Sequence, residues 1–254
     1  MGSSVIASLP MYDWPEIQHW TDRFWTRLRD QLVKSGVEAP IFLDRETPSA
    51  DIWRDPGLLF SQTCGYPYAV ELNEHVALLG APHYDVEGCG PGTYSCAVIV
   101  AASSPHTDIG ALSGQGFAFN GRNSLSGYRG FSTLVGDVET FTRDQTKSGG
   151  HRQSMDAVEA GVADFALIDG VCWWLYQRAE PAKAAGLRVL TWTAPFPALP
   201  FITSLSRGAE ERAMLQHCLK TVIASLADED ASSGLPLIGI QPVQPADYAA
   251  LAAL

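Results

Sequence analysis

The stretch GTYSCAVIVAA, residues 92–102, joins a turn-rich block to the longest apolar run of the chain. The preceding block, residues 80–94, contains four glycines and two prolines, which interrupt regular structure. Residues 95–102 form a short continuous apolar segment, typical of a fully buried strand. Because this strand is long enough to pass from one lobe to another, we expect a lobe boundary near residue 95.

On both sides of this strand the chain alternates between strand and helix patterns. Apolar residues at helical spacing are clearest at 14–34, and short apolar runs bounded by turn residues predict the strands. Strands are expected at 5–11, 40–43, 58–60, 95–102, 116–119, 163–169 and 187–193, and helices at 14–34, 51–53, 154–160, 171–176 and 209–226.

Such alternation predicts an α/β protein in which each lobe is a mostly parallel sheet flanked by helices. Ligands of these sheets bind at the carboxyl ends of the strands. We expect lobe 1 to be discontinuous, residues 1–94 plus 196–254, and lobe 2 to be residues 95–195. Two crossings between lobes describe a hinged clamshell with its ligand cleft between them.

Composition excludes several classes of partner. The 254 residues carry 17 basic and 28 acidic side chains, a net charge of −11 that disfavours nucleic acid and anionic membrane surfaces. The five cysteines include no CxxC pair, which argues against zinc and against a disulfide framework. The longest apolar run is far short of the roughly 20 residues that span a bilayer, so no direct membrane insertion is expected.

The N-terminal residues lack the basic start and the long apolar stretch of a signal peptide. We therefore expect either a periplasmic protein whose leader has been removed or a cytoplasmic protein.

A second stretch, NGRNSLSGYRG at residues 120–130, is called the serine loop here. We expect Ser124 or Ser126 to cap a helix that runs to about Val135, with its free amides available to an anion. Residues 120–152 carry five basic and three acidic side chains, a locally positive segment that suits a negative ligand. The alternative is a helix cap that binds nothing.

Several motifs, in this order and spacing, resemble the periplasmic solute-binding proteins of type 2 topology, specifically the phosphate, phosphite and phosphonate receptors of ABC transporters. The resemblance covers nearly the whole chain and implies a two-lobed periplasmic-binding-protein-like clamshell. The motifs are ASLPMYD (7–13), GTYSCAVIV (92–100), NSLSGY (123–128), GGH with a following serine (149–154) and V-x-x-G-x-A-D-F-A (158–166).

In that family a hydroxyl-rich turn of the second lobe holds phosphate or phosphonate oxygens. The resemblance assigns this role to Ser124, Leu125, Ser126 and Gly127 of the serine loop. The backbone amides of residues 126–128, including that of Tyr128, are further expected donors at the helix start. It also implies that Tyr94 offers its phenolic hydroxyl from the hinge; the alternative is a tyrosine packed at the lobe boundary.

Other candidate contacts follow from position in the chain. His151 follows two glycines and could donate to an anion, and its ordinary pKa near neutrality would add pH sensitivity; it could also be a surface turn residue. In the first lobe Tyr12, Cys64 and Gly65 follow expected strands. Asp169 ends a strand and could hold a cationic or hydroxyl substituent, or cap the next helix. The stretch PFPALPF (195–201) lacks an acidic residue, which argues against an aminophosphonate ligand.

The motifs of cofactor and catalytic sites fail when tested. HYDVEGC (83–89) alternates metal-ligand types but lies in a Gly/Pro-rich block, and GCGPG precedes a strand rather than a helix. GxSxG and GxxxxGK[ST] do not occur in the sequence. We expect no metal and no cofactor.

Together with this resemblance, the sequence predicts a non-enzymatic solute-binding protein that captures a small oxyanion, phosphate-like or phosphonate-like. The resemblance implies an ABC-type uptake system, with an ABC transporter membrane component as the partner. The alternative is a cytoplasmic enzyme or ligand sensor built on the same clamshell fold. His151, Asp169 and Cys64 are its candidate acid or base groups.

Overall fold

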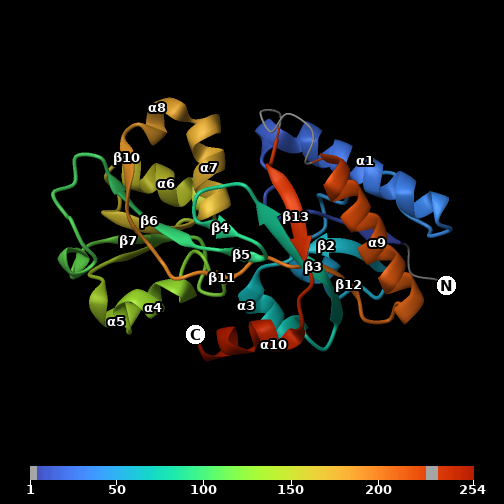
Figure 1. Cartoon of the computed structure of the whole chain (residues 1–254). Helices are drawn as coiled ribbons and strands as arrows, with labels where there is room; N and C mark the ends of the chain where they lie inside the picture. The colour runs from blue at the N-terminus through green and yellow to red at the C-terminus, as the bar shows by residue number, and fades with distance from the viewer. Residues whose placement is uncertain (1–4, 227–233) are drawn as a thin grey trace. The chain divides into compact units, whose positions relative to one another are not determined.

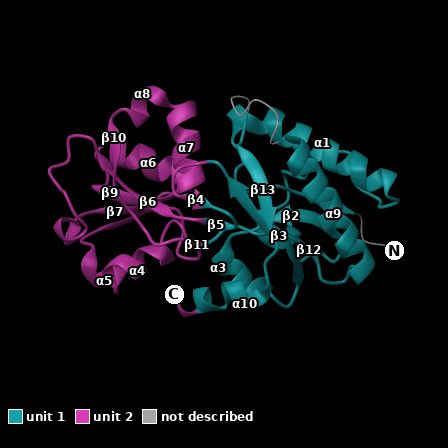
Figure 2. Cartoon of the chain, in the orientation of Figure 1, with its two compact units in different colours: residues 1–85, 90–93, 197–252 teal, residues 86–89, 94–196, 253–254 magenta. Residues whose placement is uncertain are grey.

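The computed structural model describes residues 5–226 and 234–254 and divides the chain into two compact units (Figure 2). Unit 1 holds residues 1–85, 90–93 and 197–252, and unit 2 holds residues 86–89, 94–196 and 253–254. The lobes expected from the sequence, 1–94 with 196–254 and 95–195, differ from these units chiefly at residues 86–89.

Unit 1 is built on a five-stranded sheet with the strand order β1-β2-β12-β3-β13. Strand β1 is parallel to β2, and the three other neighbouring pairs are antiparallel. The strands are β1 (Ile6–Ala7), β2 (Leu58–Gln62), β3 (Val76–Tyr84), β12 (Phe201–Ser204) and β13 (Leu237–Gln241).

Two long helices, α1 (Gln18–Lys34) and α9 (Ala209–Leu226), lie side by side over the unit 1 sheet (Figure 1). Helix α1 buries Trp20, Phe24, Leu28 and Leu32, which recur every four residues and so share one face. The shorter helical elements are η1 (Pro15–Ile17), α2 (Ser49–Ile52), α3 (Gly65–Pro67), the π-turn η2 (Tyr68–Leu72), α10 (Pro245–Tyr248) and η6 (Ala249–Ala253).

Unit 2 is built on a second five-stranded sheet, in the order β10-β6-β9-β7-β8. Strand β7 is parallel to both β8 and β9, whereas β6 is antiparallel to β9 and β10. The strands are β6 (Cys96–Ala101), β7 (Phe117–Phe119), β8 (Gln145–Lys147), β9 (Phe165–Asp169) and β10 (Leu187–Trp192).

Helices lie on both sides of the unit 2 sheet, with α6, α7 and α8 on one side and α4 and α5 on the other (Figure 1). The core beside α4 is aromatic: Phe117 stacks on Phe131 and Phe165 at centroid distances of 5.1 and 5.0 Å. The helical elements are η3 (Gly110–Leu112), η4 (Arg129–Phe131), α4 (Ser132–Val135), α5 (Val138–Phe141), α6 (His151–Glu159), α7 (Gly170–Ala179) and α8 (Pro181–Ala184).

A third, three-stranded sheet in the order β11-β5-β4 holds the residues at which the chain passes between units. Its strands are β4 (Cys89–Gly90), β5 (Thr93–Tyr94) and β11 (Phe196–Pro197).

The α/β class and the helix-flanked sheets are confirmed, but the sheets are mixed rather than mostly parallel. The reason lies in how the chain leaves and re-enters each unit. It leaves unit 1 after β3 and returns through β12, and it enters unit 2 through β6 and leaves after β10. Strands that carry the chain in and out of one unit side by side run in opposite directions, so both pairs are antiparallel.

Two strand predictions in unit 1 need correction. The first strand covers only Ile6–Ala7 rather than 5–11, and residues 40–43 form no strand. There, the carbonyl oxygens of Pro40 and Ile41 accept hydrogen bonds from the side chains of Trp25 and Arg29 on α1, at 3.3 and 3.2 Å. The apolar side chains of Ile41 and Phe42 are exposed, so this apolar run belongs to a loop fastened to α1.

In the described part of the chain, no helix combines the length and the apolar character that crossing a bilayer requires.

Candidate functional site

Three parallel strands of unit 2 end at the same edge of their sheet, because β8 and β9 both run parallel to β7. Strand β7 leads into the serine loop, β8 leads through residues 148–150 into α6, and β9 leads directly into α7. The carboxyl edge of such a sheet is where ligands bind. Each candidate residue of unit 2 is therefore judged by which of these three junctions it occupies.

The serine loop is a series of turns rather than the start of a helix. Helix η4 begins at Arg129 and α4 at Ser132, and neither has a side-chain cap. The prediction that Ser124 or Ser126 caps a helix was therefore wrong. Instead, Ser124 Oγ accepts a hydrogen bond from the backbone N–H of Gly127 at 3.1 Å, which closes a turn within the loop. Within the described chain, the backbone N–H groups of Leu125, Ser126 and Tyr128 have no hydrogen-bond acceptor.

Gly127 is required by the packing of the loop on itself. A Cβ atom at this position would lie 1.7 Å from Oδ1 of Asn120 and 2.4 Å from its Cγ. Oδ1 of Asn120 also accepts from the backbone N–H of Gly121 at 2.8 Å. A larger residue at position 127 would displace Asn120 and open the loop at its base.

Ser126 and His151 connect the serine loop to the start of α6. Ser126 is buried, and its Oγ lies 2.9 Å from Nε2 of His151, the first residue of α6. The two residues are 25 positions apart in the chain. Their contact brings together the two segments that the sequence singled out, the serine loop and the GGH turn.

The start of α6 is built around small residues. Gly149 has φ +93°, a left-handed conformation that favours glycine. Gly150 occupies the N-cap, and no side chain caps the start of α6. Ser148 Oγ fastens the turn, donating to a backbone carbonyl of Phe119 or Gly150, each at 3.0 Å.

His151 is a neutral imidazole at pH 7. Burial lowers its pKa from 6.5 to about 4, and the residue as a whole is half-buried. The expectation of a half-protonated histidine near neutral pH is therefore corrected, because the folded protein withholds the ring from the water that would stabilise its charge.

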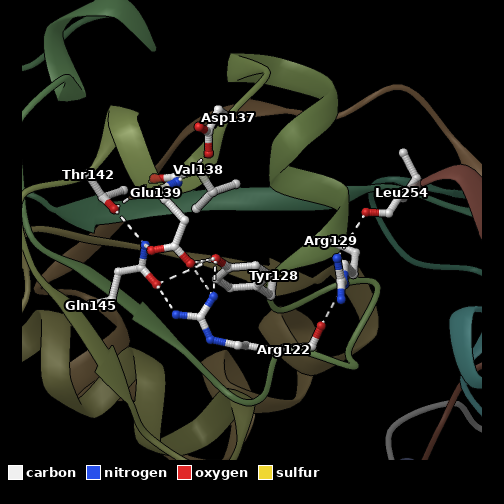
Figure 3. A network of polar contacts seen from close by, with 9 residues as sticks. All are labelled: Arg122, Tyr128, Arg129, Asp137, Val138, Glu139, Thr142, Gln145 and Leu254. Carbon is white, nitrogen blue, oxygen red and sulfur yellow. Dashed lines mark hydrogen bonds and ion pairs between the residues drawn. The ribbon is translucent and has the colours of Figure 1, made fainter.

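Tyr128 at the end of the serine loop belongs to a network with Arg122 at its beginning (Figure 3). Nη1 of Arg122 donates to the Tyr128 hydroxyl at 2.7 Å, and this hydroxyl donates to Oε1 of Glu139 at 2.8 Å. Arg122 also forms an ion pair with Glu139 and donates to Oε1 of Gln145 at 3.1 Å. The network ties both ends of the loop to α5 and β8.

The same network sets the charge states of its members. Hydrogen bonds from Arg122 and then Tyr128 lower the pKa of Glu139. Burial, followed by the hydrogen bond to Glu139, raises the pKa of Tyr128. The guanidinium of Arg122 also stacks 5.0 Å from the centroid of the Tyr128 ring. The Tyr128 side chain is thus engaged in holding the loop, while the expected ligand contact of its backbone amide stays a prediction.

Asp169 caps α7. It is buried, and its Oδ1 accepts from the backbone N–H groups of Val171 and Cys172 at 2.8 and 3.3 Å. Of the two roles that the sequence left open for Asp169, the structure shows the helix cap. The start of α7 consequently carries a negative charge of the protein's own.

Tyr94 lies in β5, buried, with its ring 6.2 Å from that of Phe196. Its position matches the alternative of a packed tyrosine at the lobe boundary, and its role as a ligand contact stays a prediction.

The three remaining candidates lie in unit 1. Tyr12 is buried edge-on against Tyr84 at 5.5 Å and lines a cavity of about 20 Å³, room for about one water. Cys64 stands at the N-cap of α3, half-buried. A Cβ atom at Gly65 would lie 3.0 Å from Leu251 and 3.4 Å from Tyr248, so glycine allows α3 to approach the C-terminal helices.

Sequence reasoning missed the residues that hold the loop: Asn120, Arg122, Glu139 and Gln145. Arg122 and Glu139 were counted only as part of a mildly positive segment. The ion pair joins positions 17 residues apart across two turns and a helix, and a single sequence carries no spacing signal for such a contact.

Known structures of similar fold cover almost the whole chain. A protein of Xanthomonas citri, XAC2383, solved bound to ATP, is 16% identical with a TM-score of 0.72, covering 99% of this chain and 96% of that one. PhnD1 from Prochlorococcus marinus, solved with methylphosphonate, is 15% identical with a TM-score of 0.67, covering 96% and 94%. The binding-protein component of an ABC phosphonate transporter from Pseudomonas aeruginosa is 16% identical, also with a TM-score of 0.67, covering 97% and 84%.

These likenesses show the type 2 periplasmic-binding-protein fold. No curated protein matches the chain in sequence. The family model described as "ABC transporter, phosphonate, periplasmic substrate-binding protein" matches residues 58–248, about three quarters of the sequence. The chain belongs to this family of phosphonate substrate-binding proteins of ABC transporters.

Proposed function

We propose that this substrate-binding protein captures a small phosphorus oxyanion, phosphate-like or phosphonate-like, at the junction of the serine loop and α6. The observation that carries the proposal is the 2.9 Å contact between Ser126 Oγ and His151 Nε2. It places the serine loop against the uncapped start of a nine-residue helix. Exposed helix amides and the positive end of the helix dipole favour an anion.

The donors available at this junction are neutral. They are the backbone N–H groups of the serine loop, the first amides of α6, and the hydroxyls of Ser124 and Ser126. His151 is neutral at pH 7 because burial lowers its pKa. A tetrahedral anion with three or four oxygens can accept several such hydrogen bonds at once, so the site needs no salt bridge to hold it.

The ligands of two relatives support this class. PhnD1 was solved with methylphosphonate and the Xanthomonas citri protein with ATP. Both ligands present tetrahedral phosphorus oxyanions, the chemical group for which the serine loop and α6 supply donors.

The proposal extends to the rest of the uptake cycle. Tyr12, Cys64, Gly65 and Tyr94 stay proposed ligand contacts, and hinge closure is the proposed response to ligand. The loaded protein then delivers the ligand to the membrane component of an ABC transporter in the periplasm. Closure predicts that saturating methylphosphonate lowers the radius of gyration in solution scattering. Tight binding with unchanged scattering would contradict closure.

A catalytic role finds little support in the groups that could perform it. Asp169 caps α7, His151 hydrogen-bonds to Ser126, and Cys64 lies in unit 1. We therefore propose that the protein binds its ligand without transforming it.

Titration calorimetry tests the ligand class. Methylphosphonate, phosphate, phosphite, ATP, sulfate, an amino acid and an uncharged sugar are compared at one ionic strength. The expected result is a phosphorus oxyanion as the tightest ligand. A preference for the amino acid or the sugar would reject the ligand class while leaving the fold unaffected.

A matched pair of variants tests the place of binding. Ser126→Asp puts a carboxylate where the ligand's oxygens belong, and Ser126→Asn places a neutral side chain of the same shape there. The account expects the aspartate to abolish binding of the best ligand and the asparagine to weaken it. An affinity equal to the parent's in both variants would show that binding occurs elsewhere.

A further inference from the structure

The hydrogen bonding of the His151 ring is one-sided. Its Nε2 lies 2.9 Å from Ser126 Oγ, while its Nδ1 is buried and has no hydrogen-bond partner in the described part of the chain. A neutral imidazole has one nitrogen that donates and one that accepts. The hydrogen bond to Ser126 therefore has two possible directions, and which one forms depends on the nitrogen that carries the proton.

The buried Nδ1 decides between the two tautomers. If Nδ1 carried the proton, a buried N–H group would have no acceptor, which is among the rarest situations in folded proteins. If Nε2 carries it, Nδ1 holds only an unused lone pair, which is better tolerated. The Nε2–H tautomer is favoured, and in it the ring donates to the oxygen of Ser126.

The direction of this bond controls what Ser126 can do. A hydroxyl that accepts from the ring keeps its own proton for another acceptor, and no other partner of Ser126 Oγ occurs among the described residues. In the opposite tautomer Ser126 would donate to the ring and turn its lone pairs toward an approaching anion, which repels it.

We propose that His151 is a positioning residue: through its Nε2–H it holds the Ser126 hydroxyl as a donor to the ligand's oxygens, without contacting the ligand itself. This inference rests on the proposed function, because it assigns a role within the same anion site. It moves His151 from the set of direct contacts to the residues that orient them.

The first test reads the tautomer without any ligand. In ligand-free protein labelled with ¹⁵N-histidine, long-range ¹H–¹⁵N spectra distinguish protonated from unprotonated ring nitrogens. The expected result is a protonated Nε2 and an unprotonated Nδ1 for His151 at pH 7. A protonated Nδ1 would overturn the inference, whatever the ligand proves to be.

The second test uses amide side chains as substitutes for one nitrogen at a time. Glutamine places an N–H donor near the position of Nε2, whereas asparagine reaches only the position of Nδ1. His151→Gln is expected to bind methylphosphonate close to the parent's affinity, and His151→Asn to lose roughly tenfold, the cost of one misdirected hydrogen bond.

Ser126→Ala provides the control for a direct contact. If His151 acts only through Ser126, adding His151→Asn to Ser126→Ala changes the affinity no further. An undiminished tenfold loss in the Ser126→Ala background would show that His151 contacts the ligand and overturn the inference. Failure of the parent to bind any phosphorus oxyanion would reject the proposed function, and the ring spectra would still decide the tautomer.

Discussion

Helices α6 and α7 begin in equivalent places, each after one of the parallel strands beside β7, yet their first turns are built oppositely. Helix α7 follows a buried aspartate, Asp169, whose carboxylate accepts hydrogen bonds from two backbone N–H groups in the first turn of the helix. Helix α6 starts behind a glycine, and its first side chain is a neutral histidine hydrogen-bonded to the serine loop. One helix start supplies its own anion and the other lacks one.

In the proposed account, this difference is why one of the two helix starts offers an anion site and the other does not. Both helices have the same backbone amides and the same dipole direction. What separates them is the residue before the first turn, Asp169 in one and Gly150 in the other. The comparison predicts opposite results for the two positions. Adding a carboxylate at Gly150 should lower ligand affinity and keep stability, whereas removing the one at Asp169 should lower stability and keep ligand affinity.

Among changes that test this comparison, the largest effect is expected from Gly150→Asp, which gives α6 an anion of its own. Gly150 has φ −165°, extended backbone that any residue adopts, and a new Cβ meets only the mobile end of the exposed Gln153 side chain. Methylphosphonate affinity should fall roughly 100-fold through like-charge repulsion, about 3 kcal/mol. Titration calorimetry measures the loss.

Gly150→Asn is the matched control for that change, because it has the same shape without the charge. Both variants should unfold at or slightly above the parent temperature, since aspartate and asparagine are better caps than glycine. Equal loss of binding in the two variants would mean that shape rather than charge excludes the ligand.

The acid stability of the fold should depend on the neutral histidine at the start of α6. The pKa of His151 is about 4 in the folded chain against 6.5 ordinarily. Between these pH values the unfolded chain binds the extra proton, so the free energy of unfolding falls as the pH decreases from 6.5 to 4. Because the residue as a whole is only half-buried, we expect about 2 kcal/mol rather than the full value of the shift.

Urea unfolding of the parent and His151→Gln at pH 7 and pH 4.5 checks this expectation. The glutamine cannot titrate, so the parent should lose more stability than the variant on acidification. Equal losses would show that His151 is not withheld from protonation in the fold.

At α7, Asp169→Ala should cost stability and leave binding unchanged. Removing a capping carboxylate typically costs about 1 kcal/mol, and the amides of Val171 and Cys172 would lose their acceptor. Chemical denaturation and calorimetry together separate the two effects. If Asp169→Ala binds methylphosphonate more weakly than the parent under conditions in which the variant is fully folded, Asp169 belongs to the ligand site.

The smallest effect is expected from Glu139→Gln. This change weakens the polar network that holds the serine loop, without altering a residue at the junction of the serine loop and α6. The ion pair of Arg122 with Glu139 is exposed and therefore screened by salt. We expect methylphosphonate affinity to fall roughly two- to fivefold at low ionic strength and less at high salt. A loss that persists unchanged in high salt would mean that Glu139 acts by another route.

The sequence was sufficient to identify the segments that form the proposed site. Alternation of strand and helix patterns predicted both sheets, and the motifs at 123–128 and 149–154 identified the two segments that Ser126 and His151 connect. These features are local: each depends on residues within about ten positions, where composition and spacing carry the information.

What the sequence could not supply depends on long-range geometry. The direction of β6 and β12 follows from how the chain passes between units, and the pKa of His151 follows from burial by residues distant in the chain. The clamp of Arg122, Tyr128 and Glu139 likewise exists only in the folded loop. The expected helix cap failed because Ser124 satisfies a nearer amide, that of Gly127.

A backbone amide titration tests the central claim most directly. ¹H–¹⁵N correlation spectra of the parent protein are recorded while methylphosphonate is added. The account predicts the largest shift changes at Leu125, Ser126 and His151, with little change at Val171 and Cys172, whose amides already have an acceptor. Largest changes at the start of α7, or none in the serine loop at saturation, would contradict it.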